Sequence, residues 1–197
     1  MTVLGSIVTK VSGTVRRIFQ SELPDNLFFH NINHTEDVVN AAIEIGSAIN
    51  LSEEESEMAQ IASWFHDVGY CYKYYGHEDL SIEIAERSLR QFNYPEGKLQ
   101  KILSCIASTK RIQVPLNLID QVIFDADFYH FSVRDYRLYE QRLRLEFQYV
   151  LGKTFTDNEW LDANCKLMTE HQYFTNYGQM VLQPNKDRNI QDLKCNG

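Results

Sequence analysis

The sequence predicts an all-α fold, built as a single-domain helical bundle. Its 197 residues suit one domain with a sizeable core. Apolar residues recur at helical spacing along most of the chain, and no segment alternates apolar and polar residues for more than about four positions. At Ser52 and at Thr156, a hydroxyl residue precedes a glutamate by three positions, which is typical of helix starts.

The helical domain is expected to cover residues 1–182, with its motif-bearing part at about residues 28–175. No internal repeat or low-complexity linker divides this region. Residues 183–197 are polar and weakly patterned, which predicts a tail that is mobile or that begins a longer segment.

The first three helices are expected in the N-terminal part of the chain. Residues 7–22 are amphipathic and stop before Pro24, which cannot continue a helix. Residues 35–50 carry one apolar stripe. A third helix opens at the capping box that begins with Ser52 and ends near Gly69.

The remaining helices follow from the same periodicity. The predicted ranges are residues 78–92, 98–108, 116–128, 134–151 and 158–175. The last of them opens at a second capping box, formed by Thr156 and Glu159.

Composition excludes several classes of protein. The net charge of −8 and the lack of a basic stripe argue against a nucleic-acid partner. The apolar runs are too short for a membrane segment, and the N-terminus lacks the features of a signal peptide. The cysteines are far apart and form no CxxC pair, so we expect reduced thiols and a cytoplasmic location: Cys71, Cys105, Cys165 and Cys195.

Four of the six histidines fall in two short segments. "FFHNINH" contains His30 and His34, and "FHDVGYCYKYYGH" contains His66 and His77, with Asp67 directly after His66. Neighbours on a helix point about 100° apart, so a shared metal ion at the helix end would explain the His-Asp pair. Read alone, each motif also fits an ordinary core histidine or the polar end of a helix.

A third segment, "IFDADFYHF", places Asp125 and Asp127 inside an apolar run. Carboxylates in such a run are costly unless they are paired or bind a metal, although they also fit a cap or turn. Imidazole nitrogens with carboxylate oxygens suit magnesium or a divalent transition ion.

The order of these motifs resembles the HD-domain metal-dependent phosphohydrolases, over about residues 29–173. The resemblance implies the metal ligands His34, His66, Asp67 and Asp127. It implies that Asp125 orients a ligand or water, with the choice between the two aspartates left open.

Catalytic roles also follow from the resemblance. Asp67 would both bind the metal and take the proton of a bound water, and His30 would act as general acid or have a structural role. His77 and Glu78 would orient the nucleophilic water.

One divalent metal ion is expected. The candidates are Mn, Co, Mg, Ni, Fe and Zn, and the sequence does not choose among them. Ser108 and Thr109 stand where dinuclear members carry histidine, which makes a second metal less expected. His77 remains the candidate ligand for such a second ion.

Lys110, Arg134 and Arg144 are the candidate phosphate ligands, and Arg111 lies next to the first. Solvated surface charge is the alternative interpretation for each of them.

The predicted function is hydrolysis of a small phosphorylated metabolite, by preference a nucleotide. A nucleotide-sensing regulatory module with little hydrolysis is the alternative, and a di-iron oxygenase is a third. The sequence leaves a homodimer open.

Overall fold

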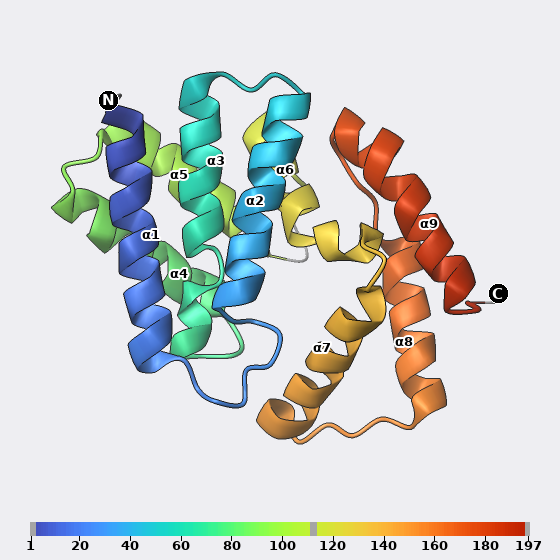
Figure 1. Ribbon diagram of the computed structural model, residues 1–197. Helices are drawn as coiled ribbons and strands as arrows, with labels where there is room; N and C mark the ends of the chain where they lie inside the picture. Colours follow the sequence, from blue (N-terminus) through green and yellow to red (C-terminus); the bar gives the residue numbers. More distant parts are fainter. Residues whose placement is uncertain (1–2, 111–113, 196–197) are drawn as a thin grey trace.

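The structure is a computed structural model that describes residues 3–110 and 114–195. Within these ranges the chain forms helices and no strand, which confirms the predicted all-α fold (Figure 1). The α-helices are α1 Val3–Glu22, α2 Ile32–Ala48, α3 Glu53–Phe65, α4 His77–Gln91, α5 Glu96–Ser108, α6 Leu118–Asp127, α7 Tyr136–Leu151, α8 Asp157–Glu170 and α9 Gln183–Asp192. Shorter turns are the 3₁₀ segments η1 Val68–Cys71 and η2 Tyr129–Ser132, and the π-helical η3 Gly178–Leu182.

Helices α1 to α6 pack around the main core. In Figure 1, α1, α3 and α2 lie side by side, and α3 also contacts α5 and α6 behind them. Apolar side chains from these helices are fully buried where they meet, such as Ile45, Ile61, Phe65, Ile106 and Ile123. The core therefore holds the C-terminal end of α3 rigidly between its neighbours.

A smaller core joins η2, α7, α8 and α9. Phe131, Tyr136, Met168 and Leu193 form this cluster and are buried. These helices lie along the right side of Figure 1, where α7 and α8 diverge toward the bottom.

Local signals fix the helix starts. Both predicted capping boxes are present, at Ser52 with Glu55 and at Thr156 with Glu159. Helix α2 begins three residues before the predicted position because the Asn31 side chain accepts hydrogen bonds from the first free backbone N–H groups.

The third helix ends at Phe65, four residues before the predicted stop at Gly69. Gly69 lies within η1, where a Cβ atom would meet the backbone oxygen of His77 at 2.0 Å. Its backbone N–H also donates to Ser81 Oγ at 2.9 Å. Gly69 is thus required for the close approach of η1 to α4, and not as a helix terminator.

The predicted polar tail contains a packed helix. Helix α9 buries Lys186, whose Nζ donates to the backbone oxygen of His171 at 2.6 Å. Asn189 donates to the backbone oxygens of Phe131 and Val133. The prediction of a tail was wrong for these residues, because polar side chains make the contacts that an apolar stripe usually makes.

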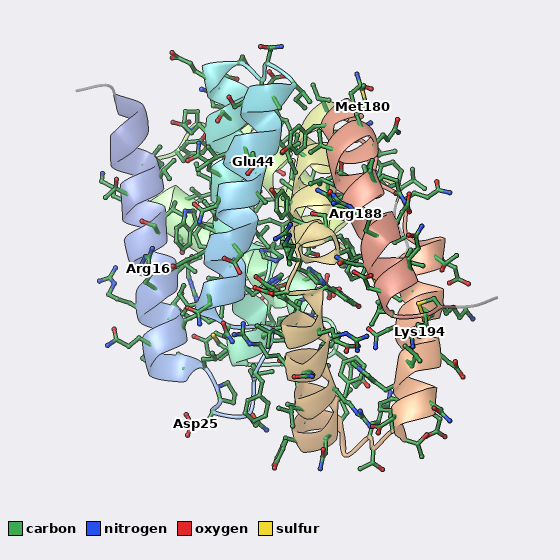
Figure 2. All side chains as sticks on the ribbon, turned by 45° about the vertical axis from the view of Figure 1, so that its right-hand side comes forward. Arg16, Asp25, Glu44, Met180, Arg188 and Lys194 are labelled. Atoms are coloured by element: carbon green, nitrogen blue, oxygen red, sulfur yellow. A yellow bond between two sulfur atoms is a disulfide. The ribbon has the colours of Figure 1, made fainter. Side chains whose placement is uncertain are left out.

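The prediction of reduced thiols was wrong for two of the cysteines. Cys165 of α8 and Cys195, beyond α9, form a disulfide beside Lys194 (Figure 2). Cys71 and Cys105 are free and buried. The disulfide ties the last helix to α8.

This pairing predicts the outcome of a thiol-labelling experiment. Iodoacetamide should modify two cysteines of the denatured, unreduced protein, and four after reduction, counted by mass spectrometry. Four modified cysteines before reduction would contradict the disulfide.

No helix in the described part of the chain is long and apolar enough to span a membrane.

Candidate metal centre

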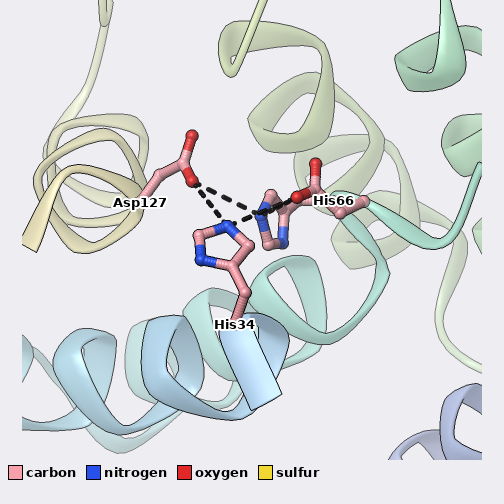
Figure 3. A group of neighbouring side chains, drawn as sticks. His34, His66 and Asp127 are labelled. Carbon is pink, nitrogen blue, oxygen red and sulfur yellow. Dashed lines mark ion pairs between the residues drawn. The ribbon is translucent and has the colours of Figure 1, made fainter. Parts of the chain in front are cut away.

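Four side chains from three helical segments meet at one point. His34 lies in the first turn of α2, His66 caps the end of α3 with Asp67 next to it, and Asp127 ends α6. One ligand atom from each lies within 4.8 Å of all the others. Figure 3 shows the two imidazoles and the Asp127 carboxylate turned toward the same space.

The distances define a compact cluster. His34 Nε2 lies 3.2 Å from Asp127 Oδ1 and 3.4 Å from Asp67 Oδ2. His66 Nε2 lies 3.1 Å from the same Asp67 oxygen and 3.6 Å from Asp127 Oδ1. Each imidazole nitrogen therefore faces two carboxylate oxygens at once.

The donor set fits a divalent cation. Both Nε2 atoms are buried and make no well-aligned hydrogen bond, despite the short distances to Asp67 and Asp127. His66 Nδ1 donates to the backbone oxygen of Ser63 at 2.7 Å, which leaves the lone pair on Nε2. Two imidazole nitrogens and two carboxylate oxygens that converge in this way are suitable ligands for such an ion.

The same closeness changes the proton affinity of all four groups. Burial would lower the pKa of His34, but close contact with Asp127 and Asp67 outweighs it and raises that pKa to about 9. Burial is also outweighed at His66, whose pKa is raised chiefly by the charge of Asp67. Burial is likewise outweighed at the carboxylates, where His66 and His34 hold the pKa of Asp67 and Asp127 low. A cation must displace the imidazole protons, so its binding should strengthen as pH rises.

A family model described as HD domain matches residues 31–132, just over half of the chain. The match contains all four residues of the cluster. The chain belongs to the HD-domain family. HD domains are in general metal-dependent phosphohydrolases and bind divalent metals. Comparison with curated proteins and with solved structures gave no match.

His77 and Glu78 lie beside the HD cluster, at the start of α4. His77 Nε2 is 3.4 Å from Asp67 Oδ1, the oxygen that faces away from the other histidines. The Tyr74 backbone oxygen holds His77 Nδ1 at 3.0 Å, and Glu78 Oε2 lies 3.7 Å from that nitrogen. Asp67 thus connects the cluster to His77.

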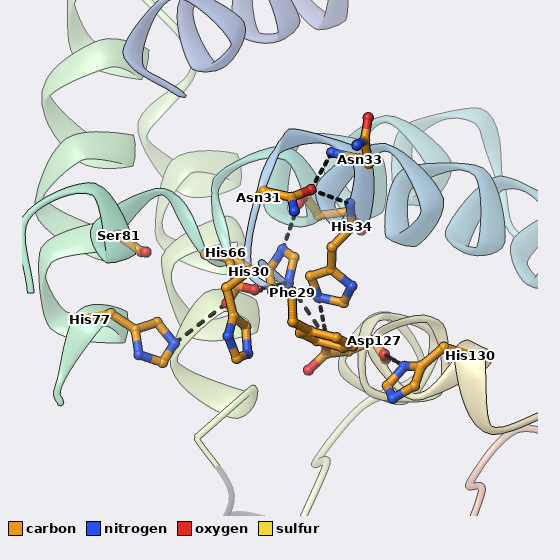
Figure 4. A network of polar contacts seen from close by, with 12 residues as sticks. Phe29, His30, Asn31, Asn33, His34, His66, His77, Ser81, Asp127 and His130 are labelled. Atoms are coloured by element: carbon orange, nitrogen blue, oxygen red, sulfur yellow. Dashed lines mark hydrogen bonds and ion pairs between the residues drawn. The ribbon is translucent and has the colours of Figure 1, made fainter. Parts of the chain in front are cut away.

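Figure 4 shows His30 and His77 near His34 and His66. The Tyr70 ring lies between the two outer histidines, at 4.1 Å from the His30 ring and 3.6 Å from the His77 ring. Packing against Tyr70 fixes the planes of both imidazoles. Sequence reasoning missed this tyrosine because nothing local distinguishes it from the other tyrosines of the segment "GYCYKYY".

Glu146 of α7 is the second residue that sequence reasoning missed. Its carboxylate is fully buried and contacts His30 Nδ1, and it accepts hydrogen bonds from the backbone N–H groups of Phe29 and His30 at 2.9 and 3.0 Å. The Tyr74 hydroxyl donates to it at 3.0 Å. Glu146 is 116 residues from His30, so only tertiary packing reveals this pairing.

We expect the Glu146 carboxylate to make a pH-dependent contribution to the free energy of unfolding. Burial would raise its pKa, but His30 outweighs burial and lowers it below the ordinary value of 4.5. A lowered pKa stabilises the fold above pH 4.5, and this stabilisation is lost as the pH falls through the lower, folded value. Glu146→Gln should cost roughly 1–3 kcal/mol at pH 7 and flatten the acid limb of stability against pH.

Urea unfolding between pH 7 and pH 3 measures this effect. Glu170→Gln, a substitution of an exposed glutamate at the end of α8, is the matched control. Parallel curves for wild type and Glu146→Gln would contradict the assigned role.

Asp125 was predicted to orient a ligand or water, and in the structure its carboxylate has partners outside the cluster. Its carboxylate accepts hydrogen bonds from the Phe174 and Thr175 backbone N–H groups at 2.8 and 2.9 Å, and from Thr175 Oγ1 at 2.6 Å. It therefore anchors the segment after α8. The cluster contains Asp127 and not Asp125, as the preferred assignment predicted.

His130 supports Asp127 from the far side. Its Nδ1 donates to the Asp127 backbone oxygen at 2.9 Å. Burial lowers the pKa of His130 to about 3, so its ring is neutral at pH 7.

A cavity of about 410 Å³ opens beside the cluster. The four residues predicted to be catalytic line it, together with a second carboxylate of the cluster: His30, Asp67, His77, Glu78 and Asp127. Thr109 also lines it, and its hydroxyl donates to the Ile106 backbone oxygen at 2.8 Å. Ser108 likewise donates to the Cys105 backbone oxygen at 2.7 Å.

The predicted phosphate ligands do not line this cavity. Lys110 pairs with Asp79 at 2.6 Å, and Arg144 pairs with Asp157 at 2.8 Å on another part of the surface. Arg134 is exposed. Among the described lining residues, Lys153 is the one lysine or arginine. Arg111 lies outside the described residues.

Proposed function

We propose that this HD-domain protein hydrolyses a small phosphate ester, with a nucleotide as the preferred substrate. The convergence of four ligand atoms, two of them buried imidazole nitrogens without an aligned partner, carries the proposal. The cavity beside them is within the range of roughly 300–1,000 Å³ typical of small-molecule sites.

The metal ligands in this proposal are His34, His66, Asp67 and Asp127. A bound divalent ion would supply an activated water at neutral pH and would neutralise charge on a phosphoryl oxygen. Asp67 is suited to a double role, because one oxygen faces the cluster and the other faces His77.

We assign His30 as the general acid. It lines the cavity, and Glu146 occupies its Nδ1, so Nε2 is the ring nitrogen left to donate a proton to a leaving oxygen. The Glu146 carboxylate at the opposite nitrogen fixes the tautomer and the orientation of the ring.

We assign His77 and Glu78 to positioning the attacking water. Both line the cavity, and His77 faces the free oxygen of Asp67 at 3.4 Å. The aromatic contact with Tyr70 and the bond to the Tyr74 backbone oxygen hold the ring in place.

A small substrate is favoured over a polymer. The net charge of −8 gives no attraction for a polyanion, and the described cavity lining contains one exposed lysine. Binding of a phosphate group would therefore depend on the metal centre and the histidines.

We also propose a cytoplasmic location. The Cys165–Cys195 disulfide counts against it, because disulfides are rare in the cytosol.

The test is phosphate release by metal-depleted protein to which Mn²⁺ or Co²⁺ is returned. Substrates are p-nitrophenyl phosphate, bis-p-nitrophenyl phosphate, nucleoside monophosphates and cyclic nucleotides. Turnover should require the metal and disappear in Asp127→Asn, while Asp162→Asn at an exposed site on α8 keeps it. Absence of turnover by the wild type with every metal and substrate would refute the proposed hydrolysis. Nucleotide binding in that case would support the sensing module instead.

A further inference from the structure

The cavity continues from the HD cluster to the two helices that diverge in Figure 1, α7 and α8. These helices lie beyond the region matched by the family model. Their contribution to the lining includes a carboxylate and an amide between apolar side chains: Glu140, Leu143, Phe147, Asn164 and Leu167. One cavity thus has a metal-binding end and a second end of different chemistry.

Glu140 at this second end is buried without a cation. Its side chain is 8% exposed, and no ion pair to it occurs among the described residues. The nearby arginines have other partners, since Arg137 donates to the Asp192 backbone oxygen and Arg144 to Asp157. The Trp160 indole approaches the carboxylate but makes no well-aligned hydrogen bond. A carboxylate in this position has acceptor capacity that the fold leaves unused.

Asn164 is fixed next to the same space. Its Oδ1 accepts a hydrogen bond from the Tyr136 hydroxyl at 2.8 Å, and its Nδ2 donates to the Trp160 backbone oxygen at 2.9 Å. These two contacts determine the orientation of the amide group, with Oδ1 toward Tyr136 and Nδ2 toward the Trp160 backbone oxygen. The oxygen retains a second lone pair for a ligand.

Aromatic rings and leucine side chains form the apolar part of the lining. Phe131, Tyr136 and Phe147 line the cavity together with Leu143 and Leu167. Aromatic walls bind flat rings through stacking and edge contacts. A flat ring that offers N–H groups at its edge would satisfy both the walls and Glu140.

We propose that this end binds the organic group of the phosphate ester, and that Glu140 selects a flat ring with N–H donors. A 2-amino-6-oxopurine has the matching chemistry, because its ring N–H and amino group lie side by side and can both donate to one carboxylate. The inference rests on the proposed function, since the metal centre at the other end would hold the phosphate.

The test uses nucleosides, which bind without a phosphate and therefore without the metal. Isothermal titration of the chelator-treated, full-length protein compares guanosine with inosine, which lacks the amino group, and with 1-methylguanosine, which lacks the ring N–H. Each missing donor should weaken binding by about tenfold, since a hydrogen bond to a charged group is lost. Equal affinity for the three nucleosides, or no binding of guanosine, would overturn the inference.

Glu140→Gln provides the second measurement. The amide keeps one acceptor oxygen and loses the other, so guanosine should bind about tenfold more weakly and most of its advantage over inosine should disappear. Glu170→Gln is the matched control and should retain wild-type affinities. Unchanged guanosine affinity in folded Glu140→Gln protein counts against the assignment. If this variant does not fold, the wild-type nucleoside series decides.

Binding of ethanolamine phosphate tests whether the second end of the cavity prefers a flexible ammonium group to a flat ring. This compound carries a flexible ammonium group in place of a flat ring, and tighter binding than guanosine 5′-monophosphate would overturn the flat-ring assignment. The two proposals also fail differently. Selective guanosine binding without phosphate release leaves this inference standing and removes the hydrolase. Metal-dependent phosphate release without nucleoside selectivity does the reverse.

Discussion

Replacing His66 with alanine is expected to abolish stoichiometric metal binding by this HD-domain protein while the helical fold survives. The His66 ring is fully buried, its Nδ1 is held by Ser63, and its Nε2 faces Asp67 and Asp127. Loss of this nitrogen removes one of four ligands and leaves the two carboxylates repelling each other across the gap. We expect metal affinity to fall by at least about 100-fold, since even residues that only support a metal ligand are worth 10- to 100-fold.

Asp67→Asn should give the same loss through a different chemical change. The amide keeps the size of the side chain but removes the negative charge shared by His34, His66 and His77. Retention of helical circular dichroism in both variants would separate metal loss from unfolding.

Elemental analysis and thermal melting measure the metal effect. Wild-type protein at a free Mn²⁺ concentration 100 times the Kd should gain about 2.7 kcal/mol of stability, or roughly 5–10 °C in Tm. His66→Ala and Asp67→Asn should show no such gain. Asp79→Asn, an exposed aspartate in the first turn of α4, is the matched control and should respond like wild type. A full complement of metal in both variants would show that the cluster is not the binding site.

Asp125→Ala is expected to produce the largest loss of stability without loss of metal. The Asp125 carboxylate is fully buried and accepts three hydrogen bonds from Phe174 and Thr175. The variant leaves these donors buried without an acceptor, which should cost roughly 3–5 kcal/mol. For a chain of this size that corresponds to a fall in Tm of roughly 6–20 °C.

The neighbourhood of Asp125 cannot relax easily around the change. A Cβ atom on Gly178 would lie only 2.3 Å from Asp125 Oδ2, so the start of η3 is packed directly against the carboxylate. Gly178 also donates its backbone N–H to Thr175 Oγ1 at 2.8 Å. The Asp125 contacts therefore hold the whole connection between α8 and α9.

Urea unfolding and metal analysis of Asp125→Ala test both parts of this expectation. Asp162→Ala, at an exposed position of α8, controls for the loss of a charge. Wild-type stability combined with lost metal would reverse the assignments of Asp125 and Asp127.

The C-terminal helices contribute residues to the site that the HD family model does not cover. Glu146 orients His30 from α7, and Glu140 with Asn164 supplies the polar end of the cavity. These three residues lie outside the matched residues 31–132. The matched region thus supplies the metal cluster, and the remainder of the chain shapes the proposed substrate pocket.

Local sequence was sufficient to predict helices α1 to α8 and the types of ligand in the metal cluster. The capping boxes at Ser52 and Thr156 each lie within one helical turn, so they depend only on residues that are near in sequence. His66 and Asp67 are adjacent, and His34 follows a capping Asn31, so these three residues have local signals in the sequence.

Tertiary packing decided the remainder. Asp125 and Asp127 are two residues apart on α6 and point in different directions, so the neighbours of that helix determine which one joins the cluster. The Glu146–His30 contact and the Cys165–Cys195 bond join distant positions that carry no local pattern. Lys186 and Asn189 look like solvent-exposed residues in sequence, yet they are buried because backbone oxygens of other segments accept their hydrogen bonds. By itself, the sequence determined helices α1 to α8 and the ligand types, since these depend on near neighbours. The structure decided the partner of His30, the polar end of the cavity and the packing of α9, because each depends on contacts between segments far apart in the chain.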